Sequence, residues 1–337
     1  MYDLKILQRR FREFGGWRLV KEYASLGLVP VIVKNFCRCI LKGQSLKTIY
    51  PAVRGKVSPM LVKRYKPIIA ESRQRYETMD LPHEHPKIVW WCWLQGLDNA
   101  PDVVKACLKS LQRNLPKDYE IRVIDEHNWR EWLTLPQYIV EKRSAGRIPA
   151  ALFSDLLRLE LLIRYGGTWI DATVLCTGVG SKGSKEGKEG KEGIEGEDVE
   201  RLLESDLFLF QYTTPEGGPF KGISNWFISA HSNNKVLMTL RDMLMAYWRD
   251  YDCTLDYYIF HLFFWGMVKA YPKEIAGMPY AYSGDALLLM NHWGEEYDEL
   301  KWKLLTSKSC FHKLSARPKK TMTDNAGDSI YRRIVNE

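Results

Sequence analysis

Four polar side chains in the middle of the chain have the types and the spacing to bind a charged, hydroxyl-rich ligand. Asp155 and Arg158 lie three residues apart, and Asp171 and Thr173 lie two residues apart. In a helix, a three-residue spacing places both side chains on one face. In an extended segment, a two-residue spacing points both side chains in the same direction. The sequence therefore predicts two candidate binding pairs, one on a helix and one at the end of a strand.

The helical pair has two interpretations. Asp155 and Arg158 could form a local ion pair on the surface, but the residues around them are mostly leucine and isoleucine, so we expect a buried helix. Buried charges require a partner or a function. A sugar whose hydroxyls contact the carboxylate and the guanidinium would supply one, and we favour this interpretation.

The strand pair suggests a site for a metal and a diphosphate. Mg²⁺ and Mn²⁺ prefer hard oxygen ligands, commonly one or two carboxylates together with phosphates and water. Asp171 offers a carboxylate, whereas Thr173 offers only a hydroxyl where a second carboxylate would bind more strongly. We therefore expect a metal at this pair to be held weakly, through water, or with the help of another residue.

These pairs lie within a pattern of alternating strands and helices, which favours an α/β fold with a mostly parallel central sheet. Ligands of such sheets bind at the ends of the strands, which is where Asp171 is expected. The expected strands are 87–93, 119–124, 169–170, 207–210 and 226–228, and the expected helices are 102–114, 128–132, 151–164, 235–248 and 255–268.

Several other residues are candidates for ligand contacts. Trp90 and Trp93 lie on the first expected strand, where either ring could stack on a nucleobase or fill the core. Asp256 either caps a helix or faces an acceptor. His312 and Lys313 belong to a late basic segment that could contact phosphate.

Charge divides the chain into two parts. Residues 1–75 contain 17 Lys and Arg against 4 Asp and Glu, a net charge of +13, which leaves −5 for the remainder. We expect a basic helical extension over residues 1–81 and one larger domain over 82–337. Leu4, Leu7, Phe11 and Phe14 indicate an amphipathic basic helix. The basic segment could contact an anionic membrane surface or pack on the larger domain.

The cysteines and the apolar runs of the sequence suggest a protein of the cytoplasm. Its 7 cysteines are odd in number and scattered, which is typical of reduced thiols. No run of 18 apolar residues is present, so no membrane span is expected. Residues 178–198 are of low complexity, rich in Gly, Lys and Glu, and are interpreted as a surface insertion or as a lid.

The run SDLLRLELLIRYGGTWIDAT, preceded by PKIVWWCWLQG and APDVVKACLKS, resembles bacterial capsular polysaccharide synthesis proteins over residues 82–320. These proteins are similar to the family 32 sugar transferases that contain a DXD motif. The resemblance implies a GT-A fold, a nucleotide-sugar donor that is usually UDP-linked, a divalent metal (Mn²⁺ or Mg²⁺) and retention of anomeric configuration.

The resemblance also implies roles for individual residues. Asp155 and Arg158 match donor-sugar contacts, Asp171 matches the first Asp of the DXD motif, and Thr173 replaces the second. Trp93 matches an aromatic that stacks on uracil. His312 matches a contact to the metal or the diphosphate.

The expected function is therefore a hexosyltransferase that adds one sugar to a capsule, lipopolysaccharide or related glycan, with a glycan or lipid-linked acceptor at the inner membrane face. The alternative is a non-catalytic protein of the same fold that binds a nucleotide sugar, a glycan or a lipid. A nucleic-acid partner is not expected, because the larger domain is acidic and contains no recognised nucleic-acid-binding motif.

Overall fold

The computed structural model describes residues 4–43, 48–178, 199–212, 222–318 and 328–336. The chain forms two compact units. The first combines residues 1–80, 133–160 and 235–272, and the second combines residues 81–132, 161–234 and 273–337. Each unit is described by itself.

The second unit is built on a five-stranded sheet in the order β2-β1-β3-β6-β5. The three strands β2, β1 and β3 are parallel, and β6 is antiparallel to both of its neighbours, so four of the five strands run in one direction. This confirms the prediction of a mixed α/β unit with a mostly parallel sheet. The strands span Ile88–Cys92 (β1), Glu120–Ile124 (β2), Gly167–Asp171 (β3), Leu207–Gln211 (β5) and Ile223–Ala230 (β6).

The strands form where the sequence predicts them because they are rich in apolar, β-branched and aromatic residues that are buried in the sheet. Helix α5 (Asp102–Asn114) connects β1 to β2 and buries one face at helical spacing. Its core partners come from both ends of the unit, including Ile170 of β3 and Phe311 near the C-terminus.

Two glycines allow β3 to start close to β1. Helix α8 (Ala150–Tyr165) ends at Gly166, where φ is +73°, and Gly167 follows with φ +91°. A Cβ on Gly167 would lie 2.6 Å from the Ile88 carbonyl oxygen, and one on Gly166 would lie 2.3 Å from the Glu84 carbonyl oxygen. Both positions therefore require glycine, for conformation and for space.

A second, two-stranded sheet was not predicted. It pairs β4 (Val174–Cys176) with β7 (Phe311–Lys313) in antiparallel register. Helix α5 packs on β4, and α13 (Ser283–His292) packs on β7. The smaller helices with residues in this unit are α6 (Trp129–Trp132), α9 (Val199–Leu203), α12 (Pro272–Ala276), α14 (Glu299–Thr306) and α16 (Ile330–Asn336).

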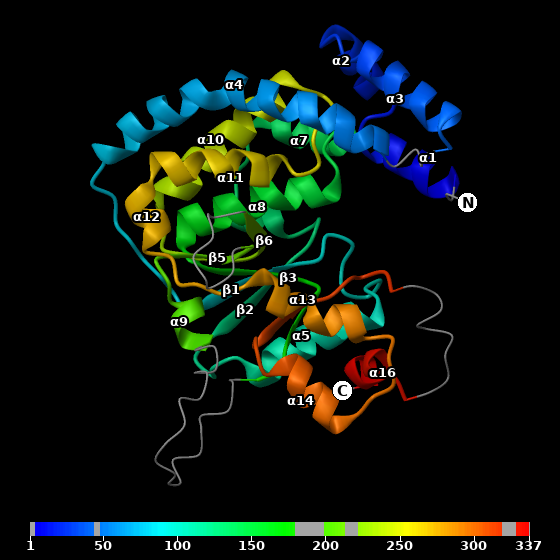
Figure 1. The fold of residues 1–337 in the computed structure, drawn as a ribbon. Coiled ribbons are helices and arrows are strands. Elements are labelled where there is room, and N and C mark those ends of the chain that lie inside the picture. Colours follow the sequence, from blue (N-terminus) through cyan, green and yellow to red (C-terminus); the bar gives the residue numbers. More distant parts are fainter. Residues whose placement is uncertain (1–3, 44–47, 179–198, 213–221, 319–327, 337) are drawn as a thin grey trace. The chain divides into compact units, whose positions relative to one another are not determined.

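The described part of the first unit is helical. Its long helix α4 (Ile49–Glu77) runs beside α10 (Lys235–Asp250) and α11 (Ile259–Ala270), as Figure 1 shows. The sequence-based division assigned the N-terminal helices to an extension of their own, whereas in the structure they share one unit with α10 and α11. The other helices are α1 (Leu4–Glu13), α2 (Trp17–Ser25), α3 (Val29–Leu41), α7 (Gln137–Ser144) and α8 as far as Glu160.

The described helices differ from membrane spans in length or in composition. Within the described ranges, no individual helix has both the length and the apolar character to cross a bilayer. Helices α2 and α3 reach that length and composition only together, and they are bent by 113° relative to each other.

Candidate functional site

The end of β3 carries a compact polar cluster in the second unit. The Lys313 ammonium lies 2.9 Å from Asp171 Oδ2 and 2.5 Å from Thr173 Oγ1. The other carboxylate oxygen, Asp171 Oδ1, accepts a hydrogen bond of 2.9 Å from the Trp169 indole. The side chains of Lys313 and Asp171 are 21% and 25% exposed, so this ion pair remains open to a ligand.

The small β4–β7 sheet is what brings Lys313 to this place. Lys313 is registered with Val174, and the Leu314 amide donates to the Thr173 carbonyl over 2.8 Å. Two backbone segments far apart in sequence are thereby fixed next to each other. Sequence reasoning grouped Lys313 with phosphate-binding residues, but residues 310–314 show no alternation that would indicate the strand that positions it.

The cluster lies at the carboxyl edge of the parallel strands. Asp171 is registered with Cys92, the last residue of β1, and Trp93 follows directly. The Trp93 indole nitrogen is buried and has no hydrogen-bond partner among the described residues. The structure therefore brings Trp93 and Asp171 to the same edge of the sheet, where ligands of α/β sheets bind.

His312 does not join Lys313 at Asp171. Neighbouring strand residues point to opposite faces, and the His312 ring is fully buried with Nε2 3.1 Å from Thr177 Oγ1. Burial lowers the pKa of His312 to about 4, so the imidazole is neutral near pH 7. The structure gives His312 an interior position away from the expected diphosphate contact.

Trp90 is a core residue in this structure. Its ring is fully buried, and its indole donates to the Gly166 carbonyl over 2.9 Å. The rings of Trp132 and Tyr165 lie 5.4 and 5.5 Å away. These neighbours leave the Trp90 ring no free face for a nucleobase.

Asp155 and Arg158 belong to the first unit. They form a buried ion pair of 3.3 Å between Asp155 Oδ1 and Arg158 Nη1. The Arg158 guanidinium also donates to the carbonyl and the hydroxyl of Ser154, which fixes it along the helix. The helix is buried as expected, and the two charges neutralise each other there.

Asp256 also lies in the first unit and is fully buried. It accepts hydrogen bonds from Arg54 Nε at 3.0 Å, from Ser58 Oγ at 2.9 Å and from the Tyr258 amide at 2.8 Å. The last of these contacts closes a turn before α11, which begins at Ile259 and not at the expected residue 255, with Tyr258 as its N-cap. Asp256 is thus held in the interior by Arg54 and Ser58, and its partner Arg54 was not foreseen from sequence.

The donor set at Asp171 is a poor match for a divalent metal. Asp171 supplies one carboxylate, Thr173 supplies a hydroxyl, and Lys313 places a positive charge against both. In the part of the chain that the structure describes, no group of three or more His, Cys, Asp or Glu side chains could hold a metal ion. The residues present therefore do not fit the metal that the sequence motif implies. The low-complexity residues 178–198, interpreted as a surface insertion or as a lid, lie outside the described ranges except for residue 178.

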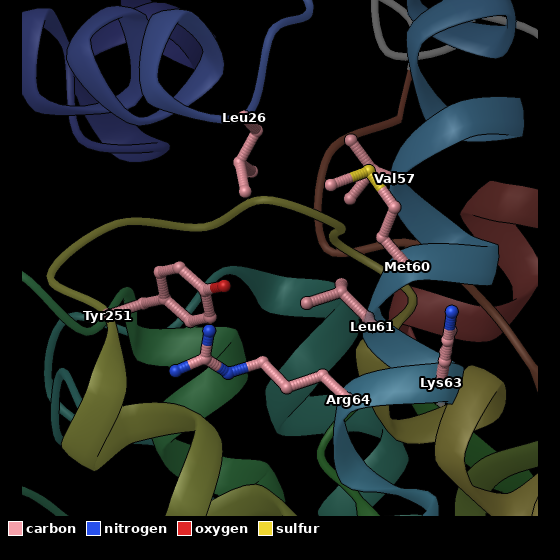
Figure 2. Close-up of a pocket in the computed structure, with 7 residues that line it drawn as sticks. All are labelled: Leu26, Val57, Met60, Leu61, Lys63, Arg64 and Tyr251. Atoms are coloured by element: carbon pink, nitrogen blue, oxygen red, sulfur yellow. The ribbon is translucent and has the colours of Figure 1, made fainter.

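A separate cavity of about 420 Å³ lies in the first unit. Figure 2 shows its lining, in which the Tyr251 ring lies close to the Arg64 guanidinium. The lining residues are Leu26, Val57, Met60, Leu61, Lys63, Arg64 and Tyr251. None of the site residues expected from sequence is among them.

Comparisons with known proteins identify the family of the chain. A model of the family described as capsular polysaccharide synthesis protein matches residues 38–334, so the chain belongs to this family. Over 98 residues it is 32% identical to the O-glycosyltransferase PaGT of Phomopsis amygdali, covering 27% of this chain and 24% of that protein. The chain thus spans about a quarter of this relative. The solved PaToxG glycosyltransferase is similar at 15% identity with a TM-score of 0.37, covering 64% of this chain and 80% of that one. The family and the relative support sugar transfer in general.

Proposed function

We propose that this member of the capsular polysaccharide synthesis family is a hexosyltransferase with a GT-A-like second unit, which moves a sugar from a nucleotide donor, UDP-linked, to a growing surface polysaccharide with retention of configuration. The observation that carries the proposal is the Asp171–Thr173–Lys313 cluster at the carboxyl edge of the sheet. A cation there meets the charge of a donor diphosphate.

The chemistry requires stabilisation of a leaving group. The bond between the sugar C1 and the diphosphate oxygen breaks, and its electron pair stays on the diphosphate. The acceptor oxygen forms the new bond to C1 on the face that the diphosphate leaves, and the proton of the acceptor hydroxyl passes to the leaving diphosphate oxygen. The Lys313 ammonium stabilises the charge that develops on the diphosphate, and preorganised charges of this kind are usually the largest contribution to catalysis.

The remaining donor contacts follow from the motif. Trp93, at the end of β1, is proposed to stack on the base, and its unpartnered indole supports a ligand contact at that position. Trp90, Asp256 and His312 are left out of the proposed site, because the structure gives each of them an interior role. Asp155 and Arg158 are also left out, because they belong to the first unit and pair with each other in its buried helix.

We also propose that α3 holds the protein at the anionic inner face of a membrane, where a lipid-linked acceptor would be available. Val29, Val33, Phe36 and Ile40 form an exposed apolar stripe at helical spacing, and Ile40 alone is 64% exposed. Lys34 and Arg38 are exposed beside it. An apolar stripe flanked by cations is the pattern of a helix that lies in a membrane interface.

The cavity of Figure 2 supports the same proposal. Four of its seven lining residues are aliphatic side chains or methionine, and Lys63 adds an exposed cation, whereas Arg64 is paired with Asp250 at 2.9 Å. That combination suits the hydrocarbon chain of an anionic lipid. The acceptor lipid and the bulk membrane lipid share this chemistry, so the cavity supports lipid contact without choosing between them.

The donor proposal is tested with a panel of UDP-, GDP- and dTDP-sugars and with membrane extract as acceptor. Turnover of one UDP-sugar that Asp171→Asn abolishes is the expected result. The matched control is Asp118→Asn, which breaks an exposed Asp–Lys pair of 2.7 Å with Lys87 in the same unit. Binding of a nucleotide sugar without turnover would instead favour the non-catalytic binding protein.

The membrane proposal is tested by sedimentation with vesicles of anionic or neutral phospholipid. The full chain is expected to sediment with anionic vesicles only, and the double variant Phe36→Glu/Ile40→Glu is expected to remain in solution. The control is Leu300→Glu, which places the same charge on an exposed leucine of the second unit. Equal sedimentation of all three proteins would refute the assignment of α3.

A further inference from the structure

We propose that Lys313 supplies the positive charge that the DXD motif assigns to a divalent metal, so that the donor diphosphate is bound and released without a metal ion. This inference rests on the proposed function and adds to it the identity of the cation. It is carried by three observations, namely the contacts of Lys313, the loss of one carboxylate at Thr173, and the way the backbone fixes both.

The contacts place the ammonium where a cation bridging the two motif positions would lie. Lys313 Nζ contacts Asp171 Oδ2 at 2.9 Å and Thr173 Oγ1 at 2.5 Å, so one cation touches both residues of the Asp-x-Thr pair. A divalent ion on the same two side chains would have to displace the lysine. The Asp171 oxygen that faces away from the lysine accepts the Trp169 indole proton.

The charge count is consistent with such a replacement. Two carboxylates and a divalent ion carry a net charge of zero. Asp171 with a neutral threonine and one ammonium also carries a net charge of zero. Exchanging the second carboxylate for Thr173 therefore removes one negative charge, and Lys313 in place of a divalent ion removes one positive charge.

The backbone makes the arrangement permanent rather than incidental. Lys313 is registered with Val174 in the β4–β7 sheet, and the Leu314 amide donates to the Thr173 carbonyl at 2.8 Å. The lysine therefore emerges from a backbone that is hydrogen bonded to the motif itself. A flexible surface lysine would have no such anchor.

The first experiment measures Mn²⁺ binding by electron paramagnetic resonance on the full chain, without any donor. Wild-type protein is expected to show no stoichiometric Mn²⁺ site. The double variant Thr173→Asp/Lys313→Met restores two carboxylates and removes the ammonium, so it is expected to gain one bound Mn²⁺. Lys87→Met, which removes an exposed lysine from an ion pair in the same unit, is the control and is expected to behave as wild type.

The second experiment measures UDP binding by calorimetry in the presence and absence of EDTA. Wild-type affinity is expected to be unchanged by EDTA, Lys313→Met is expected to bind at least tenfold more weakly, and the double variant is expected to bind only with Mn²⁺. Retention of most of the affinity by Lys313→Arg would identify the charge, not the shape, as the important property.

Two results would overturn the inference. One is a stoichiometric Mn²⁺ site in wild type that Asp171→Asn removes, and the other is a folded double variant that gains no Mn²⁺ site. Neither result depends on donor binding. Absence of UDP binding in every protein would count against the proposed function, and the Mn²⁺ measurements would still decide the role of Lys313.

Discussion

Two aspartate–cation pairs of similar length, one in each unit, differ in their surroundings. Asp256 and Arg54 in the first unit are 3.0 Å apart, and Asp171 and Lys313 in the second are 2.9 Å apart. Asp256 is fully buried and accepts hydrogen bonds from a guanidinium, a hydroxyl and a backbone amide. The Asp171 pair keeps about a quarter of the carboxylate exposed at the end of a strand.

The exposure of the carboxylate and its remaining hydrogen-bonding capacity distinguish a structural ion pair from a functional one. A buried carboxylate with all its hydrogen bonds made has nothing left to offer a ligand, and its loss is felt as instability. A partly exposed pair contributes little to stability but presents a charge to whatever enters from solvent. The first pair is therefore expected to govern folding, and the second is expected to govern activity.

The largest effect on stability is expected when the buried Asp256 loses its partner Arg54. Arg54→Met removes the cation and leaves the Asp256 carboxylate buried with only its Ser58 and Tyr258 hydrogen bonds, which is expected to lower the free energy of unfolding by about 3 kcal/mol, the low end for a buried pair because Arg54 is 37% exposed. Urea unfolding measures it. Arg73→Met, which breaks an exposed pair with Glu77 on the same helix, should cost no more than about 0.5 kcal/mol. Equal costs for the two variants would break the distinction.

The second largest effect is expected on the rate of sugar transfer, when the partly exposed Asp171–Lys313 pair is broken. Lys313→Met is expected to reduce sugar transfer by roughly 10²–10³-fold, because it removes a charge aimed at the leaving group. Its free energy of unfolding should change by only about 1 kcal/mol. Steady-state kinetics and urea unfolding on the same preparation measure both quantities. A variant that loses stability but keeps its turnover per folded molecule would place Lys313 among the structural residues.

The pH dependence of stability sharpens the description of the buried side. Burial lowers the pKa of His261 to about 4, and the positive charges of Arg158 and Arg54 lower it as well. The Asp256 carboxylate raises the same pKa. The folded state therefore holds His261 neutral. The unfolded state, with the ordinary pKa of about 6.5, binds a proton more readily. The stability that His261 contributes is present above pH 6.5 and is lost as the pH falls toward 4.

A substitution isolates this contribution. His261→Gln is expected to reduce the loss of stability between pH 7 and pH 5 by about 2 kcal/mol, measured by urea unfolding at both values. The exposed His292, which pairs with Glu295, provides the control substitution His292→Gln. An unchanged pH profile in His261→Gln would show that the ring titrates normally in the folded state.

The smallest expected effect concerns the contrast between α3 and α4. Helix α4 buries its apolar stripe, which includes Val53 and Leu61, whereas α3 exposes one that includes Val33 and Ile40. Lys34→Gln, beside the exposed stripe, is expected to weaken binding to anionic vesicles by about 1 kcal/mol, or roughly fivefold. Lys63→Gln on α4 measures whether the lysine of the cavity contributes as much to vesicle binding as Lys34 does. Full binding by Lys34→Gln would show that charge on α3 is not used.

The sequence predicted the sheet well because its strands are apolar runs closed by clear breaks. Helix α5 begins and ends where expected, at Asp102 and Asn114. The expected start of α11 was wrong because Asp256 accepts the Tyr258 amide in a turn before the helix, and Arg54 and Ser58 of a distant helix hold the carboxylate there. Strand β7 was missed because three residues carry too little periodicity to distinguish a strand from a loop.

The candidate site was foreseen only in part for the same reason. Asp171 and Thr173 could be recognised from their spacing, since both lie in one segment. The contact with Lys313 joins residues 140 or more positions apart and depends on the β4–β7 register. Burial of Trp90 and His312 is likewise decided by tertiary neighbours, and no local pattern distinguishes a buried aromatic or histidine from one that meets a ligand.

The most direct test of the central claim is a crystal structure of the full chain with UDP, grown in the presence of EDTA. The diphosphate is expected at the carboxyl end of β3, within hydrogen-bond distance of Lys313 Nζ, with no metal between them. A nucleotide bound away from Asp171 and Lys313 would contradict the claim.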